Sequence, residues 1–236
     1  MIFGMGRPEG GYRDDTCRRV PSVTTVISAT EAAGPGLERW LMRHGMAAAD
    51  MRERAAARGS LVHTAIEAAL RADDAGDDWD AAATRVVDEA FELDDVADEA
   101  VVGIHAWCAW WREWRGGVDL IAAEVPCVHP ECGFGGTPDL VALVGGRPVV
   151  VDWKTSSATR TSHVVQVAAY AMLVERCGLV ADEIDEAIIV RIPCDGHSVE
   201  EVVVSGSHLS LARVEFLRRL DSYRWARDTR RALGVR

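Results

Sequence analysis

Two apolar runs joined by Gly145-Gly146 place the strongest constraint on how this chain can fold. The first run ends at Val144 and the second begins at Arg147, and two glycines between such runs are typical of a tight β-hairpin turn. A symmetric turn pairs Val144 with Arg147 and, further along the same ladder, Asp139 with Asp152. We therefore expect two carboxylates directly opposite each other, with Cβ atoms roughly 4.5–5.5 Å apart.

The facing carboxylates indicate a metal site. Like charges placed opposite each other on paired strands repel, so strand pairing alone does not explain Asp139 and Asp152. A hard divalent cation between them does, because Mg²⁺ is usually held by one or two carboxylates together with waters and substrate phosphates. This interpretation requires a regular ladder, since a slip of one residue would turn one aspartate to the other face of the sheet.

Lys154 follows Asp152 on the same face of the expected strand, with Trp153 on the opposite face. It is the only lysine in a chain that contains 26 lysine and arginine residues. A compact ammonium group that can approach a phosphate or a water differs from a guanidinium fork, and an ordinary surface cation in this chain would be arginine. A chemical role for Lys154 is therefore favoured over that of a solvated charge at a strand end.

Periodicity predicts helices in the first half of the chain and a sheet in the second. Helical pattern extends from about residue 37 to 114, with breaks near Gly45, Gly59 and Gly76, after an irregular start over residues 1–20. The further elements expected are strands at about 118–128, 136–144, 147–154, 184–192 and 199–204, and helices at 162–177 and from Ser207 onwards. Trp107, Trp110, Trp111 and Trp114 share one helix face, which predicts a buried stripe, with a base-stacking surface as the alternative.

Length and composition are those of a globular protein. The 236 residues suit one domain, or one domain with a helical lobe, and 48% of them are hydrophobic and 27% charged. No apolar run reaches the length of a transmembrane helix, and the first fifteen residues lack the pattern of a secretory signal. Six scattered cysteines are typical of reduced thiols, so we expect a cytoplasmic protein that does not associate with membranes.

Charge is unevenly distributed along a chain whose net charge is −11. Residues 213–236 contain eight arginines and three acidic residues, a net of +5, so the remainder carries −16. Residues 73–99 contain twelve acidic residues and one arginine; a solvated helix face explains this most simply, and partner binding is the alternative. The arginine-rich end either presents cations to phosphates or forms an amphipathic helix that covers the sheet.

Five short segments with characteristic residues follow one another along the chain: Pro21–Val26, Gly59–His63, Gly136–Asp139, Asp152–Lys154 and Gln166–Tyr170. Together they resemble the PD-(D/E)XK nuclease superfamily and, within it, the RecB-like branch that includes phage-type exonucleases. The resemblance implies an α/β fold with a restriction-endonuclease-like core, in which helices flank a mixed central β-sheet. It also implies a helical N-terminal lobe over residues 1–116 and a nuclease core over residues 117–236, within one structural domain.

The resemblance implies metal-dependent chemistry at these segments. It assigns one or two Mg²⁺ or Mn²⁺ ions to His63, Asp139, Asp152 and Trp153, and the imidazole ligand favours Mn²⁺. Lys154 would orient or activate the attacking water and stabilise charge on the phosphate. Because an unperturbed imidazole titrates near pH 6.5, such a site would lose its histidine ligand below about pH 6.

Three further residues are catalytic by the same resemblance, and each has a structural alternative. Glu124, at the end of the first expected strand, joins the site in the family or is a surface glutamate. Gln166 and Tyr170 share a helix face at a spacing of four residues, where they either face the site and the DNA or pack the helix on the sheet. For His63, which shares a face with Glu67, the alternative is a structural histidine.

The implied activity is hydrolysis of DNA phosphodiester bonds, with duplex or single-stranded DNA as the partner. We expect an exonuclease of DNA recombination, repair or phage DNA processing in a bacterial or phage-infected cell, acting with a recombination partner protein. Its contacts with DNA would include Arg218, Arg219, Arg230 and Arg231. The alternatives are a structure-specific endonuclease on the same core and a catalytically silent DNA-binding module.

Cysteine spacing does not favour a second metal group. Some RecB-like proteins hold an iron–sulfur cluster, but Cys177 and Cys194 lie far apart and no C-x-x-C follows the core. Cys127, His129 and Cys132 lie close together, as zinc ligands do, yet they lack an evident fourth ligand and regular spacing. We therefore expect neither an iron–sulfur cluster nor zinc.

Overall fold

A six-stranded mixed sheet lies at the centre of the structure, a computed structural model that describes residues 1–31, 35–91 and 96–234. Its strands, in spatial order, are β1 (Ile2–Phe3), β2 (Val118–Ala123), β5 (Leu140–Val144), β6 (Arg147–Lys154), β7 (Glu186–Arg191) and β8 (Glu200–Ser205). The pairs β1–β2 and β6–β7 are parallel, and the other pairs are antiparallel. A separate hairpin consists of β3 (Cys127–His129) and β4 (Phe134–Gly136).

The β5–β6 hairpin has the predicted register. Val144 pairs with Arg147 across two glycines with φ of 58° and 79°, a left-handed conformation that favours glycine. The ladder continues without a bulge to Leu140 opposite Val151. Every residue from Pro148 to Trp153 is buried, because β6 is a central strand covered on both faces; this explains the continuous apolar run from Pro148 to Val151.

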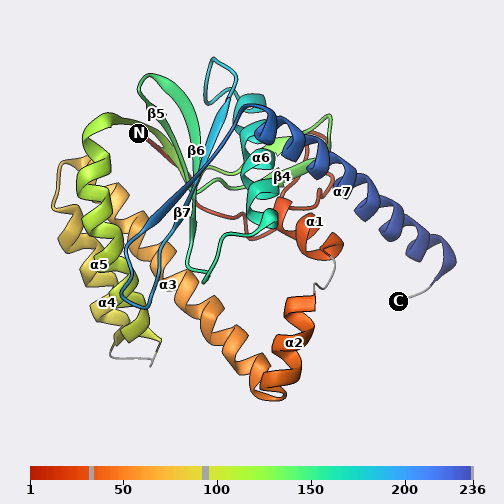
Figure 1. Ribbon diagram of the computed structural model, residues 1–236. Coiled ribbons are helices and arrows are strands. Elements are labelled where there is room, and N and C mark those ends of the chain that lie inside the picture. Colours follow the sequence, from red (N-terminus) through yellow and green to blue (C-terminus); the bar gives the residue numbers. More distant parts are fainter. Residues whose placement is uncertain (32–34, 92–95, 235–236) are drawn as a thin grey trace.

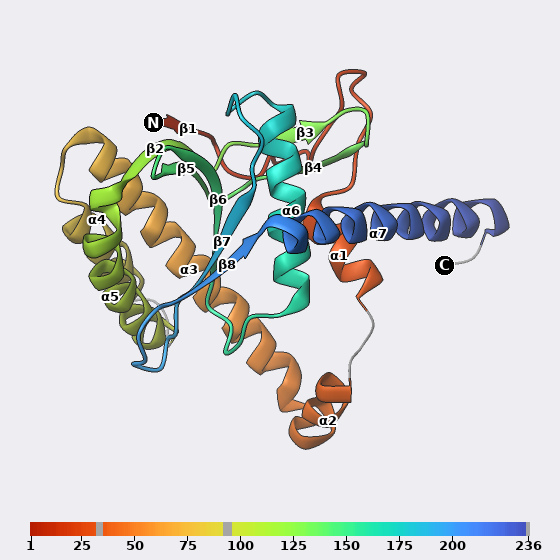
Figure 2. The same ribbon diagram turned by 45° about the horizontal axis from the view of Figure 1, so that its top comes forward.

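Helices cover both faces of the sheet (Figures 1 and 2). One face is covered by α3 (Ala47–Ala75), α4 (Trp79–Phe91) and α5 (Ala97–Trp114). The other is covered by α6 (Thr161–Arg176), α1 (Val23–Thr30) and the first half of α7 (Gly206–Leu233). The short α2 (Pro35–His44) and the end of α7 project from the body. The mixed sheet flanked by helices confirms the predicted restriction-endonuclease-like α/β fold.

Side-chain alternation along β6 separates the two cores. Val149, Val151 and Trp153 pack with α3, α4 and α5, whereas Val150 packs with α6. The predicted tryptophan stripe belongs to the first core: Trp107 and Trp111 are fully buried, and Trp107 lies 6.1 Å from Trp153, ring centre to ring centre. The prediction of a buried stripe is confirmed for Trp107 and Trp111, whereas Trp110 and Trp114 are half-buried at the edge of this core.

Four sequence-based boundaries are wrong. The strand expected over residues 136–144 is interrupted at residues 137–139, because Gly136 ends β4 in the separate hairpin and β5 begins only at Leu140. Gly59 does not break the helical region, because α3 runs continuously through it, although Gly45 and Gly76 do end helices with φ of 51° and 78°. The strand expected over residues 118–128 ends at Ala123, and β3 belongs to another sheet. Residues 1–20 are not wholly irregular, because β1 pairs with β2.

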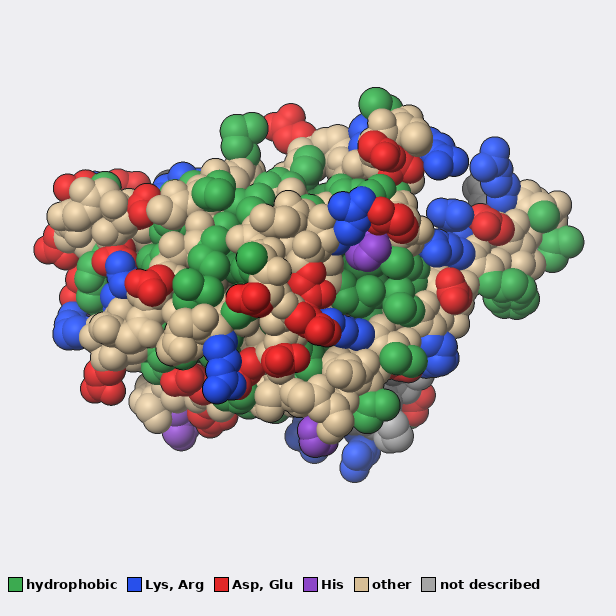
Figure 3. Space-filling model, turned by 90° about the horizontal axis from the view of Figure 1, so that it is seen from above, with side chains coloured by type: hydrophobic (Ala, Val, Ile, Leu, Met, Phe, Trp, Pro, Cys, Tyr) green, Lys and Arg blue, Asp and Glu red, His purple; other side chains and the backbone are tan. Residues whose placement is uncertain are grey.

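Charged side chains are unevenly distributed over the surface. Arginine side chains gather around the projecting part of α7 and the N-terminal loop opposite it, at the right of Figure 3.

None of the helices described here is long and apolar enough to cross a membrane.

Candidate metal centre

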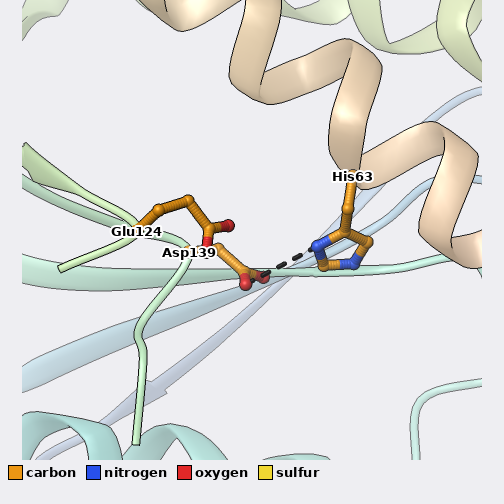
Figure 4. A group of neighbouring side chains, drawn as sticks. All are labelled: His63, Glu124 and Asp139. Carbon is orange, nitrogen blue, oxygen red and sulfur yellow. Dashed lines mark ion pairs between the residues drawn. The ribbon is translucent and has the colours of Figure 1, made fainter. Parts of the chain in front are cut away.

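The side chains of His63, Glu124 and Asp139 converge between α3 and the sheet (Figure 4). The Nδ1 atom of His63 lies 3.6 Å from Oδ1 of Asp139. One potential ligand atom from each of the three residues lies within 4.8 Å of the other two. Within residues 1–31, 35–91 and 96–234, this is the only group of three or more histidine, cysteine or acidic side chains so placed.

Gly59 brings His63 to the site. The two residues lie one turn apart on the same face of α3. A Cβ atom at position 59 would lie 3.2 Å from Oγ1 of Thr155, in the segment that follows β6. The absent side chain therefore lets α3 approach the end of β6 closely, and this explains the Gly-x-x-x-His spacing in physical terms.

Glu124 is held in an unusual backbone conformation directly after β2. Its φ of 53° is left-handed, which is uncommon for a residue other than glycine. The N-terminal segment fixes it, because the amide of Gly4 donates to the Ala123 carbonyl (2.9 Å) and that of Gly6 to the Glu124 carbonyl (3.1 Å). A Cβ atom at position 4 would lie 1.9 Å from the Glu124 carbonyl oxygen, so only glycine permits this approach. Sequence reasoning missed this role of Gly4 and Gly6. The only indication in the sequence was that two glycines lie two positions apart.

Asp139 lies at the end of the β5–β6 ladder, immediately before β5. Its Oδ2 atom accepts a hydrogen bond from the backbone amide of Trp153 (2.8 Å). Asp139 and Asp152 are both buried, and each carboxylate affects the pKa of the other. The structure thus brings the two predicted aspartates together, at the point where the paired strands end.

The carboxylate of Asp152 contacts Lys154 and Gln166 and is not a member of the group formed by His63, Glu124 and Asp139. Its Oδ2 atom lies 2.5 Å from Nζ of Lys154, and its Oδ1 atom accepts a hydrogen bond from Nε2 of Gln166 (3.0 Å). Gln166 also donates to the hydroxyl of Tyr170 (3.1 Å). The α6 residues expected to face the site therefore do so, as a chain of contacts that ends on Asp152.

The indole of Trp153, a residue expected to bind metal, faces away from the site. Its ring lies 5.9 Å from that of Trp110, centre to centre, within the core under α5. An indole offers a donor and no lone pair for a cation. Any contact of Trp153 with a metal ion is therefore limited to its backbone, which borders Asp139 and Asp152.

Burial dominates the electrostatics of the site. It raises the pKa of Asp139 and of Asp152 to about 6, against the opposing charge of Lys154. Burial and the charge of Asp139 raise the pKa of Glu124 to about 8. Burial and the charge of Lys154 lower the pKa of His63 to about 4. The imidazole is therefore neutral well below the pH of 6 expected from the sequence, and it can act as a ligand at physiological pH.

These residues fit a divalent cation. Buried carboxylates whose pKa values are raised lack sufficient compensating positive charge, and an oxygen-rich group with one imidazole suits Mg²⁺ or Mn²⁺. The charge of Lys154 compensates both aspartates in part, and its ammonium group forms an ion pair with Asp152.

Two tyrosines pack on either side of the Gly135-Gly136 pair. A Cβ atom at position 135 would lie 2.5 Å from the ring of Tyr12, and one at position 136 would lie 2.8 Å from the ring of Tyr170. The hydroxyl of Tyr12 lies 2.8 Å from Oγ1 of Thr137, two residues before Asp139. Tyr12 is thus a neighbour of the site that sequence reasoning missed.

The remaining candidate residues lie elsewhere. Arg218 and Arg219 on α7 both donate to Glu215, at 2.8 and 2.7 Å. Together with Arg230 they line a hollow beside α1, whereas Arg231 is exposed outside its lining. Cys127, one of the three close-spaced candidates for zinc, donates its thiol hydrogen to the Val125 carbonyl (3.6 Å) and lies next to the thiol of Cys177.

Comparison with models of protein families gives a match over most of the chain. A model of the PD-(D/E)XK nuclease superfamily matches residues 37–231, from α2 almost to the end of α7, and so includes all residues of the candidate metal centre. No curated protein shows significant similarity to the chain.

Proposed function

Because the chain belongs to the PD-(D/E)XK nuclease superfamily, we propose that it is a metal-dependent deoxyribonuclease, specifically an exonuclease of the RecB-like branch. The observation that carries the proposal is the convergence of His63, Glu124 and Asp139 next to the Asp152–Lys154 ion pair. A silent DNA-binding module would have no use for this group of buried carboxylates, because they are costly to keep ionised.

We assign the metal ligands to His63, Glu124 and Asp139, with Asp152 next to them. One or two Mg²⁺ or Mn²⁺ ions fit this oxygen-rich set. When bound, such a cation polarises a phosphoryl oxygen and promotes deprotonation of water.

The protein's own groups position charge around the scissile phosphate. The ammonium of Lys154, held by Asp152, is directed to where negative charge develops in the transition state. Gln166 orients the Asp152 carboxylate, and Tyr170 orients the Gln166 amide, so both act as positioning residues. The dense core around Trp107 and Trp153 keeps the end of β6 rigid, which such positioning requires.

The resemblance of the five segments to the RecB-like branch supports a proposal for the cellular role. We propose that the protein processes DNA ends in recombination, repair or phage DNA metabolism, in the cytoplasm of a bacterial or phage-infected cell and with a recombination partner protein. Residues 1–116 supply His63 and the segment that holds Glu124, and residues 117–236 supply the other site residues.

Cleavage of linear and closed circular DNA tests the proposal. In Mn²⁺ the wild-type protein should degrade linear duplex DNA and leave covalently closed circles intact, and EDTA should abolish the activity. Rapid nicking of closed circles would instead support a structure-specific endonuclease on the same core. Binding without any cleavage in Mg²⁺ or Mn²⁺ would contradict the nuclease assignment and support a silent DNA-binding module.

A further inference from the structure

Two adjoining hollows lie between α7 and the N-terminal part of the chain. The near hollow, of about 350 Å³, is lined by Arg7, Tyr12, Arg19 and the start of α1 on one side and by Tyr223 and Arg227 of α7 on the other. The far hollow, of about 570 Å³, lies between the end of α1 and the part of α7 from Arg218 to Arg230. Tyr223 lines both, so the two hollows adjoin at its side chain.

Both hollows are cationic, although the protein carries a net charge of −11. The near hollow is lined by Arg7, Arg19 and Arg227 without an acidic side chain. The far hollow is lined by three arginines, Arg218, Arg219 and Arg230, and one aspartate. A concave surface with this balance attracts an anion that the rest of the surface repels.

An exposed tryptophan lies in the far hollow. Trp225 is 71% exposed, while Trp107, Trp111 and Trp153 are almost completely buried. A large aromatic side chain left in solvent next to arginines provides a platform on which an unpaired base can stack. Duplex DNA does not offer such a face except at its ends, because its bases are already stacked on one another.

The near hollow begins beside the metal centre. Arg7 directly follows Gly6, whose amide donates to the carbonyl of Glu124. Tyr12, which also lines this hollow, contacts Thr137 close to Asp139. A chain of cationic and aromatic groups therefore leads from the site past Arg7 and Tyr12, over Tyr223, to Trp225.

We propose that the near and far hollows form one track for a single-stranded segment of the nucleic acid, continuous with the phosphodiester at the metal centre. This inference rests on the proposed nuclease function. The phosphates contact the arginines, and bases stack on Trp225 and Tyr223. Because the track leaves the site along α7, the end of that helix is a substrate-binding element rather than only a cover for the sheet.

Measuring DNA binding in the presence of EDTA tests the track separately from cleavage, because EDTA removes the metal ion that cleavage requires. Fluorescence anisotropy with labelled oligothymidylate and with blunt duplex DNA measures affinity without cleavage. Trp225→Ala should weaken oligothymidylate binding about ten-fold, and Trp225→Phe should restore most of it, with little change for duplex. Leu211→Ala is the matched control, because Leu211 is also exposed on α7 (66%) but lines neither hollow.

The salt dependence tests the arginines. A triple replacement of Arg19, Arg227 and Arg230 by Gln should reduce the slope of log affinity against log salt by about 2, since each phosphate contact on a single strand contributes about 0.7. Arg85→Gln, an exposed position on α4, should leave the slope unchanged. Circular dichroism of each variant checks that it is folded.

Unchanged oligothymidylate affinity and slope in these variants would overturn the track while leaving the nuclease function in place. Equal competition by polyglutamate would also overturn it, and would indicate an acidic protein partner instead. A wild-type protein that binds oligothymidylate as expected but cleaves no DNA would contradict the proposed function and retain the track.

Discussion

The ammonium of Lys154 lies 2.5 Å from Oδ2 of Asp152, and both side chains project from the same face at the end of β6. The only lysine of the chain is thus fixed by a buried carboxylate, which in turn is fixed by Gln166. A point charge placed in this way differs from a guanidinium group, which is larger and donates in a fixed fork.

Lys154→Arg should therefore reduce cleavage roughly 10²-fold although it keeps the charge, as does loss of one transition-state donor in other enzymes. Single-turnover cleavage of linear DNA in Mn²⁺ measures the effect. Asp152→Asn should abolish cleavage while still offering Gln166 an acceptor. Near-wild-type cleavage by Lys154→Arg would refute the role assigned to the ammonium group.

His63→Ala should weaken Mn²⁺ binding, because His63 is the only imidazole in the candidate metal centre. Calorimetry measures the affinity directly, and cleavage should require a higher concentration of Mn²⁺. His105→Ala, an exposed position on α5, is the control and should bind Mn²⁺ as the wild-type protein does. Equal Mn²⁺ affinity in both variants would make His63 a structural histidine.

Bound Mn²⁺ should stabilise the fold, and Glu124 should be needed for this effect. A ligand present at 100 times its dissociation constant stabilises the native state by about 2.7 kcal/mol, which is visible as a rise in Tm. Glu124→Gln should remove most of this rise. Glu67→Gln is the matched control, because Glu67 also lies beside the site but pairs with Arg71 at 2.6 Å. Similar loss in both variants would point to a general charge effect.

Gly59→Ala should move His63 and reduce cleavage several-fold, since small displacements of catalytic groups are costly. The added methyl group would press on Oγ1 of Thr155 at 3.2 Å. Removing that oxygen in the double variant Gly59→Ala/Thr155→Ala should restore part of the activity. If the double variant is no more active than Gly59→Ala although Thr155→Ala alone is active, contact with Thr155 is not the reason for glycine at position 59.

Cys177 should react with iodoacetamide at unusually low pH. The neighbouring thiol of Cys127 lowers the pKa of Cys177 to about 6, so the reactive thiolate predominates above that pH. The labelling rate, followed by mass spectrometry, should rise with a midpoint near pH 6. In Cys127→Ala the midpoint should shift towards the ordinary thiol value of about 8.5. An unchanged midpoint would contradict this origin of the shift.

The sequence by itself determined the local geometry of the site. The register of the β5–β6 hairpin follows from two turn glycines and from the alternation of side chains, both of which depend only on neighbouring residues. For the same reason Asp152 and Lys154 could be placed on one strand face, and the tryptophans at helical spacing in the core. These interactions involve residues a few positions apart.

Only the tertiary structure decided which groups meet at the metal centre. The contact between His63 and Asp139 depends on how α3 crosses the sheet, and the left-handed conformation of Glu124 depends on an N-terminal segment that pairs with β2. Sequence periodicity reports the face on which a side chain lies, but not the element that packs against that face. The hydrogen bond from Gln166 to Asp152 likewise arises only when α6 packs against the end of β6.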